Sequence, residues 1–201
     1  MKNNRKLITL CIALLIISGA FAQDSTLIII IKEKPWYKPD YAKVQFAGNV
    51  GFLSVGFGYN FFNNHLCSDI LYGYVPASVS KAKEIHTITI KNTTPIFTKE
   101  IRAITLSPIT GFTVSYETGN NSFLKLPDKY PKDYYSTNAF HFTFFIGAKV
   151  HKDINNSKRI NGIDFYFELG TVDTYLWYAI KSKEVNINQI FSSAIGINLY
   201  F

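Results

Sequence analysis

The sequence predicts an all-β fold, an eight-stranded antiparallel up-and-down transmembrane β-barrel. Apolar residues alternate with polar or small ones along most of the chain, which is the pattern of strands that face lipid on one side and a lumen on the other. Aromatic residues make up 16% of the chain, with 17 Phe and 13 Tyr, which is high for a soluble domain. The connections alternate between short turns and longer polar loops, as they do in membrane barrels.

The N-terminus predicts an exported protein. Residues 1–22 have the parts of a signal peptide, which are a basic start, a short apolar run and small residues before the cleavage point. These parts are, in order, Lys2, Arg5 and Lys6, then Leu7–Ala20, then Ala20 and Ala22. The apolar run is too short for a membrane span, which disfavours an uncleaved anchor. Cleavage before Gln23 leaves 23–201 as the barrel domain, in which 23–41 is either an N-terminal extension or the first strand.

Seven strands follow from the alternation, counted back from the C-terminus: 190–201, 162–170, 139–151, 103–117, 86–92, 66–76 and 52–62. The C-terminal strand, 190–201, shows the pattern most clearly. One of its faces carries Ile195, Ile197, Leu199 and Phe201, and the other carries Ala194, Gly196, Asn198 and Tyr200. The apolar face is expected to contact lipid.

The eighth strand has two interpretations, because the apolar residues change from even to odd positions near Gly51. A tight turn at that point makes 43–50 the first strand. Alternatively, a β-bulge carries one long strand through 43–62, and Thr26–Lys32, with its four consecutive isoleucines, becomes the first strand. The glycine-rich run from Ala47 to Gly58 favours the bulge. Both interpretations give eight strands.

The lengths of the connections predict which side of a membrane each connection faces. The short ones, at Asn63–His65, Thr93–Glu100 and Asp153–Asn161, are expected on the periplasmic side together with both termini. The longer ones are Pro76–Ile85, Thr118–Asn138 and Thr171–Gln189, and they are expected outside.

A barrel of eight strands has an interior that side chains fill, so no open pore is expected. The alternation turns charged residues of both signs inward: Lys43, Asp69, Lys91, Glu117, Lys149, Asp164 and Glu168. Together they could form a plug of paired charges.

Composition and motifs exclude several other classes. The formal charge of +7 includes three basic residues of the signal peptide, and the rest of the excess is spread along the chain, so nucleic-acid binding is not expected. No apolar run after the signal peptide is long enough for a membrane helix. Cys67 has no cysteine to pair with in the mature chain, and the four histidines do not have metal-ligand spacing. No cofactor or metal is expected.

The C-terminal segment Ala194–Phe201 resembles the closing strand of outer-membrane β-barrels of Gram-negative bacteria, which end in an aromatic residue preceded by alternating apolar residues. Here Ile195, Ile197, Leu199 and Phe201 occupy those positions. The mature chain as a whole resembles the small, uncharacterised outer-membrane β-barrel proteins, through Trp36–Asp40, Gln45–Ser54, Leu71–Pro76 and Ile85–Asn92. The resemblance implies a location in the outer membrane, and barrel-assembly machinery that reads the terminal strand.

We expect a structural or surface-interaction role without catalysis, and two alternatives stay open. The first is a lipid A-modifying hydrolase in which His141 acts with Glu117 or Glu168 and with Ser136 or Thr143, as a catalytic triad requires. The chain has no His-x-Ser-Asn motif, which the lipid A deacylases carry, and this weakens the hydrolase hypothesis. The second is a periplasmic lipocalin-like barrel that binds a small apolar ligand.

Two long loops could contact lipopolysaccharide, because they combine aromatic and basic residues. These residues are Lys125, Lys129, Tyr130, Lys132, Tyr134 and Tyr135 in one loop, and Tyr175, Trp177, Tyr178, Lys181 and Lys183 in the other. The same aromatic residues fit the interfacial girdle of a membrane barrel, which is the interpretation we favour.

Overall fold

The structure is a computed structural model, and it describes residues 35–81, 83–118, 139–154, 159–173, 176 and 190–201. The chain divides into two compact units, Met1–Pro35 and Trp36–Phe201. The fold described below is that of the second unit. Among the described residues, no helix is long and apolar enough to cross a bilayer.

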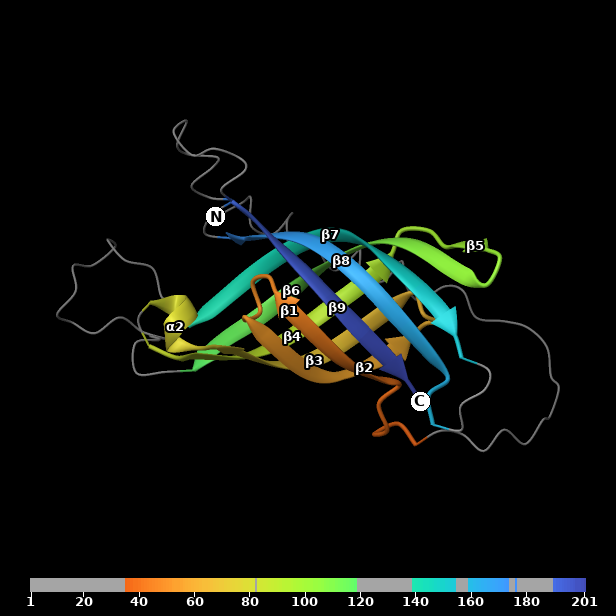
Figure 1. Ribbon diagram of the computed structural model, residues 1–201, viewed down its shortest axis with the longest axis horizontal. Coiled ribbons are helices and arrows are strands. Elements are labelled where there is room, and N and C mark those ends of the chain that lie inside the picture. The colour runs from red at the N-terminus through yellow and green to blue at the C-terminus, as the bar shows by residue number, and fades with distance from the viewer. Residues whose placement is uncertain (1–34, 82, 119–138, 155–158, 174–175, 177–189) are drawn as a thin grey trace, which may run out of the picture. The chain divides into compact units, whose positions relative to one another are not determined.

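Nine strands and one short helix have defined bounds among the described residues of this unit. They are β1 (Tyr41–Ala47), β2 (Leu53–Phe61), β3 (Leu66–Val75), α2 (Ala77–Ser80), β4 (Ile85–Pro95), β5 (Lys99–Ile101), β6 (Ile104–Thr118), β7 (Phe140–Asp153), β8 (Gly162–Val172) and β9 (Phe191–Tyr200). The strands lie side by side in one sheet and run obliquely to the long axis of the view (Figure 1).

Eight of these strands form a closed antiparallel barrel. Each strand pairs with its neighbour in sequence, β9 pairs back onto β1, and β4 pairs directly with β6. The short β5 pairs with β6 and extends the β4–β6 connection as a hairpin. The predicted all-β barrel of eight antiparallel strands is therefore confirmed. Closure matters energetically because it leaves no long unpaired strand edge.

The first strand of the described barrel is Tyr41–Ala47, so the favoured bulge across 43–62 is wrong. β1 and β2 are separate antiparallel strands, with Val44 opposite Val55. The chain reverses through a turn in which Ala47 and Gly48 have φ of 60° and 81°. This reversal, and not a bulge, moves the apolar residues from even to odd positions. The alternative first strand, Thr26–Lys32, lies outside the described residues.

The other predicted strands are confirmed to within a few residues, and β4 shows the largest difference. It continues to Pro95, whereas the prediction stopped at residue 92, because Thr93 and Thr94 pair with Gly111 and Thr110 of β6. The predicted tight turn before His65 is also present, with Phe62, Asn63 and Asn64 at positive φ. Asn adopts this conformation more readily than most residues.

The two ends of the barrel differ in their connections. We call the end where β1 begins and β9 ends the terminal end, and the opposite end the loop end (Figure 1). The connections at 62–65, 96–103 and 154–161 belong to the terminal end. The longest connections, at 119–139 and 173–190, belong to the loop end, as predicted, together with 76–84 and the tight turn at 48–52.

The side chains alternate as predicted, with large apolar residues outside. Phe57, Ile90, Phe144 and Phe167 lie on the outer face and are 46–55% exposed. The inward positions of the barrel strands hold the buried polar residues: Lys43, Gln45, Ser54, Asp69, Thr89, Lys91, Thr113, Thr143, Asp164, Glu168 and Asn198. The interior of this barrel is therefore polar and its surface apolar.

Candidate functional site

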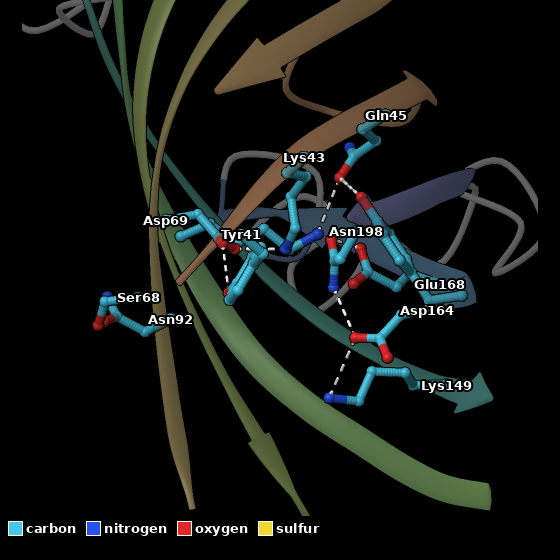
Figure 2. A network of polar contacts seen from close by, with 12 residues as sticks. Tyr41, Lys43, Gln45, Ser68, Asp69, Asn92, Lys149, Asp164, Glu168 and Asn198 are labelled. Carbon is cyan, nitrogen blue, oxygen red and sulfur yellow. Dashed lines mark hydrogen bonds and ion pairs between the residues drawn. The ribbon is translucent and has the colours of Figure 1, made fainter. Parts of the chain in front are cut away.

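The candidate site is the lumen, which a central cluster of charged residues blocks. Asp69 on β3 is fully buried, forms an ion pair with Lys43 on β1, and accepts a hydrogen bond of 2.6 Å from the Tyr41 hydroxyl. Lys91 on β4 donates to Glu168 on β8 at 2.5 Å and to Gln45 Oε1 at 2.8 Å. Figure 2 shows Lys43, Asp69, Gln45 and Glu168 reaching towards one another across the lumen.

Aromatic rings flank the ammonium groups of Lys43 and Lys91. The Lys91 ammonium lies 4.7 Å from the ring centre of Phe145 and 4.9 Å from that of Tyr166. The Lys43 ammonium lies 5.0 Å from the same Tyr166 ring. Such contacts stabilise a cation more when it is removed from water. The two ion pairs therefore form one cluster, linked through Tyr166.

The inward glycines make room for these rings. Tyr41 is the register partner of Gly58, Phe145 that of Gly111, and Tyr166 that of Gly196. A β-carbon built on Gly58 would lie 2.0 Å from Cζ of Tyr41, and one on Gly196 would lie 2.2 Å from the Tyr166 hydroxyl oxygen. A side chain at these positions would therefore clash with the ring of the neighbouring strand. The glycines thus allow the rings to fill the middle of the lumen.

A second cluster lies between the central cluster and the terminal end. The fully buried Asp164 carboxylate accepts hydrogen bonds from Tyr200 at 2.7 Å and from Asn198 at 2.9 Å. His151 Nδ1 lies 2.6 Å from the other Asp164 oxygen, and its Nε2 lies 3.1 Å from Asp153. Lys149 completes the cluster with its ammonium 3.5 Å from Asp164 (Figure 2).

The charged plug expected from the alternation is therefore confirmed in its pairing. Lys43, Asp69, Lys91 and Glu168 are buried inside the barrel, and each has a partner of opposite charge. A buried ion pair loses hydration on both sides, so it is tolerated only where geometry and further hydrogen bonds compensate. Here Tyr41, Gln45 and the aromatic rings supply those contacts.

The terminal end opens into a polar cavity of about 440 Å³. Its walls include Asp40, Asn60, Ser107, Lys149, His151 and Asp153. Sequence reasoning assigned no role to His151, although alternation places it inward on β7 two residues from Lys149 and opposite Asp164. The register between β7 and β8 was the missing information.

The loop end opens into a cavity of about 360 Å³ with a different lining. Its walls combine apolar residues at strand ends with Ser115, Glu117 and His141. The turn between β1 and β2 folds into this end, since Thr87 donates to the Val50 carbonyl and Ser192 donates to Asn49 at 2.7 Å. Val50 is buried by this arrangement.

The structure brings together only part of the predicted catalytic group. His141 Nε2 lies 3.7 Å from Glu117 Oε2 at the loop-end cavity. Glu168 instead pairs with Lys91 in the central cluster. Thr143 lines a separate small cavity of about 20 Å³, and Ser136 lies outside the described residues.

A hydroxyl that the sequence did not suggest lies at the strand position opposite His141. Ser115 is the register partner of His141 and lines the same cavity. Its hydroxyl forms a hydrogen bond of 2.8 Å with Thr89 and is almost fully buried. This bond ties Ser115 into the barrel wall, whereas a nucleophile needs its hydroxyl within reach of a base.

Metal ligands do not gather in the described part of the chain, where no group of three or more His, Cys, Asp or Glu side chains could hold an ion. A scan against protein-family models finds no match, and comparisons with curated proteins and with solved structures find none either. The site must therefore be interpreted from its own geometry.

Proposed function

We propose that this chain is an integral β-barrel of the bacterial outer membrane, which acts as a sealed anchor for its long loops and not as an open pore. One observation carries the proposal: large apolar side chains cover the outside of the barrel, and paired charges fill the inside. A soluble barrel has the opposite arrangement. This parity also opposes the periplasmic lipocalin-like alternative, whose interior would be apolar.

The outer surface has the composition that lipid requires. Val55, Ile70, Ile88, Phe142 and Phe165 are 46–58% exposed, and they belong to five different strands. Soluble monomers rarely expose continuous apolar patches of more than a few hundred Å². An apolar belt on every wall is costly in water and favourable in a bilayer.

Aromatic and polar side chains mark both borders of this belt. At the loop end, the outward Tyr72 hydroxyl lies 2.5 Å from His86 Nδ1, and the rings of Tyr116 and Phe140 are in contact. Towards the terminal end, Ser68 donates to Asn92 at 2.6 Å on the outer face. Amphipathic rings are typical of the membrane–water interface.

The closing strand supports an interaction with the barrel-assembly machinery. β9 pairs with β1 along seven residues, and Ile195 on its outer face is 54% exposed. Phe201 follows the strand at the terminal end, which the proposal places in the periplasm. The lipopolysaccharide contacts expected of the two long loops involve residues outside the described part of the chain.

The proposal is tested by expressing the full chain and separating membrane and aqueous fractions. We expect the protein in the outer-membrane fraction, with faster gel migration when unheated than when boiled, because a closed barrel resists detergent unfolding until it is heated. Recovery in the aqueous fraction, with the same migration before and after boiling, would contradict the proposal.

A lipid A-modifying hydrolase is the second candidate function, and the His141–Glu117 pair at the loop-end cavity favours it. Such an enzyme would need its base within reach of an outer-leaflet substrate. Mass spectrometry of lipid A from cells that produce the protein or the His141→Ala variant tests this candidate. The candidate requires a modified lipid A that disappears in the variant, and identical spectra in both strains and in the empty-vector strain would remove it.

A further inference from the structure

The terminal-end cavity contains a lysine whose ammonium group has one long ion-pair contact among the described residues. Lys149 is largely buried, and this contact is with Asp164, at 3.5 Å. Charge-assisted N–H···O bonds are normally about 2.7–2.9 Å long. An ammonium group has three donors, so the contacts within the described part of the chain leave the Lys149 ammonium with donors that a ligand in the cavity could use.

Asp164 is shared among several donors, and its contact with the Lys149 ammonium is the longest of them at 3.5 Å. One oxygen contacts His151 Nδ1, and the other accepts from Asn198 and Tyr200. His151 is held between Asp164 and Asp153, with a nitrogen near each carboxylate, and only the imidazolium can donate at both nitrogens. Its positive charge is therefore already balanced within the protein.

The rest of the cavity wall offers neutral polar groups and two peripheral carboxylates. Ser107 faces Lys149 across β6 and β7, and its hydroxyl donates to Thr98 at 3.3 Å. The Asn60 side-chain oxygen is buried and has no hydrogen-bond partner among the described residues. Asp40 and Asp153 also line the cavity and add negative charge.

This distribution selects one class of ligand. A single cation with free donors favours a carboxylate, while the nearby Asp40 and Asp153 disfavour a phosphate dianion through like-charge repulsion. Carboxylates and amides in turn suit a ligand with several hydroxyl groups, because a hydroxyl donates to a carboxylate and both donates to and accepts from an amide. The volume of about 440 Å³ lies in the range of small-molecule sites.

We propose that the terminal-end cavity is a binding site for a sugar acid, in which Lys149 pairs with the carboxylate and the amide, hydroxyl and carboxylate side chains around it bind the hydroxyl groups. This site goes beyond the anchor function and does not depend on the barrel spanning a membrane. The proposed orientation would open it to the periplasm.

The test uses the full chain folded in detergent micelles and titrated by calorimetry with glucuronate, glucose and inorganic phosphate. We expect saturable binding of glucuronate, and binding of glucose and phosphate that is weaker by about tenfold or more, as for loss of a hydrogen bond to a charged group. Phosphate binding as tight as glucuronate, or no glucuronate binding, would overturn the proposal.

A matched pair of variants separates the site from a general effect of charge. Lys149→Met should weaken glucuronate binding about tenfold or more. Lys152→Met removes the same charge from the exposed outer face of the same strand, so it should leave binding unchanged. An equal effect of both substitutions would contradict the site. Heat-dependent gel migration of each variant shows whether the barrel is folded, so failure of the anchor function is distinguishable from failure of this site.

Discussion

At the terminal end of the barrel the cavity is walled by carboxylates, amides and hydroxyls, whereas at the loop end Val50, Val75, Ile85 and Val172 stand beside a single His141–Glu117 pair. Strands β4, β6, β7 and β8 supply residues to both linings, and alternation points these residues inward at each end. The difference arises because the last inward positions of β3 and β8 and the first of β4 are aliphatic, and because the 48–52 turn brings in Val50. Between the two ends lies the central charged cluster.

The largest effect is expected from removing one partner of an ion pair in the central charged cluster, which separates the two ends of the lumen. Glu168→Leu leaves Lys91 buried without its carboxylate, which should lower the free energy of unfolding by about 3–5 kcal/mol. Urea unfolding of the detergent-folded barrel measures the change. The double variant Lys91→Met with Glu168→Leu should regain most of the lost stability, and a double variant as unstable as the single one would argue against a charge effect.

The second-largest effect is expected from a charge placed in the apolar belt on the outer face of the barrel. Ile90 lies on the outer face of β4, and Ile90→Arg should destabilise a lipid-embedded barrel by about 2–4 kcal/mol if that position lies near the bilayer centre. Unfolding in lipid vesicles measures this cost. Asn92→Arg, two residues nearer the terminal end on the same face, is the control and should cost less. Equal stability of both variants would contradict a membrane-centred Ile90.

A direct comparison of the two ends comes from one carboxylate at each. Asp164→Asn removes the charge of a buried carboxylate that contacts three donors and replaces one of its oxygens by an NH2 group, which should cost about 1–3 kcal/mol. Glu117→Gln alters a partly exposed pair at 3.7 Å and should cost no more than about 1 kcal/mol. Chemical denaturation of both variants under one condition gives the ranking, and the reverse order would refute it.

The smallest expected effect concerns the turn that folds into the loop end. Gly48 has φ of +81°, and a β-carbon there would lie 2.8 Å from Cβ of Ala194. Gly48→Ala should therefore destabilise by about 1–2 kcal/mol through backbone strain alone. Thermal unfolding compared with the Gly51→Ala variant, at a glycine without positive φ, measures it. An unchanged transition in Gly48→Ala would show that the turn relaxes at no cost.

Period-two alternation in the sequence predicted the barrel, the outer apolar face and the inward charges, because strand geometry fixes which side each residue faces. It did not predict which charges pair. Lys91 reaches Glu168 on β8, a partner set by barrel closure and strand stagger. The same limit hid the His151–Asp164 contact and the position of Ser115 opposite His141. The change of parity near Gly51 was visible, but a bulge and a reversal produce the same local pattern.

The two central ion pairs differ in how much of the chain must fold before each can form. Lys43 and Asp69 are 26 residues apart, in β1 and β3, so the hairpins at the start of the barrel are enough to bring them together. Lys91 and Glu168 are 77 residues apart, and their contact spans the β4–β6 junction and two further strands. The Lys91–Glu168 contact therefore requires strands β6, β7 and β8 in addition to the strands of the first hairpins. Both charges are neutralised only when β4 and β8 are joined in one closed sheet, so this ion pair links the two halves of the barrel.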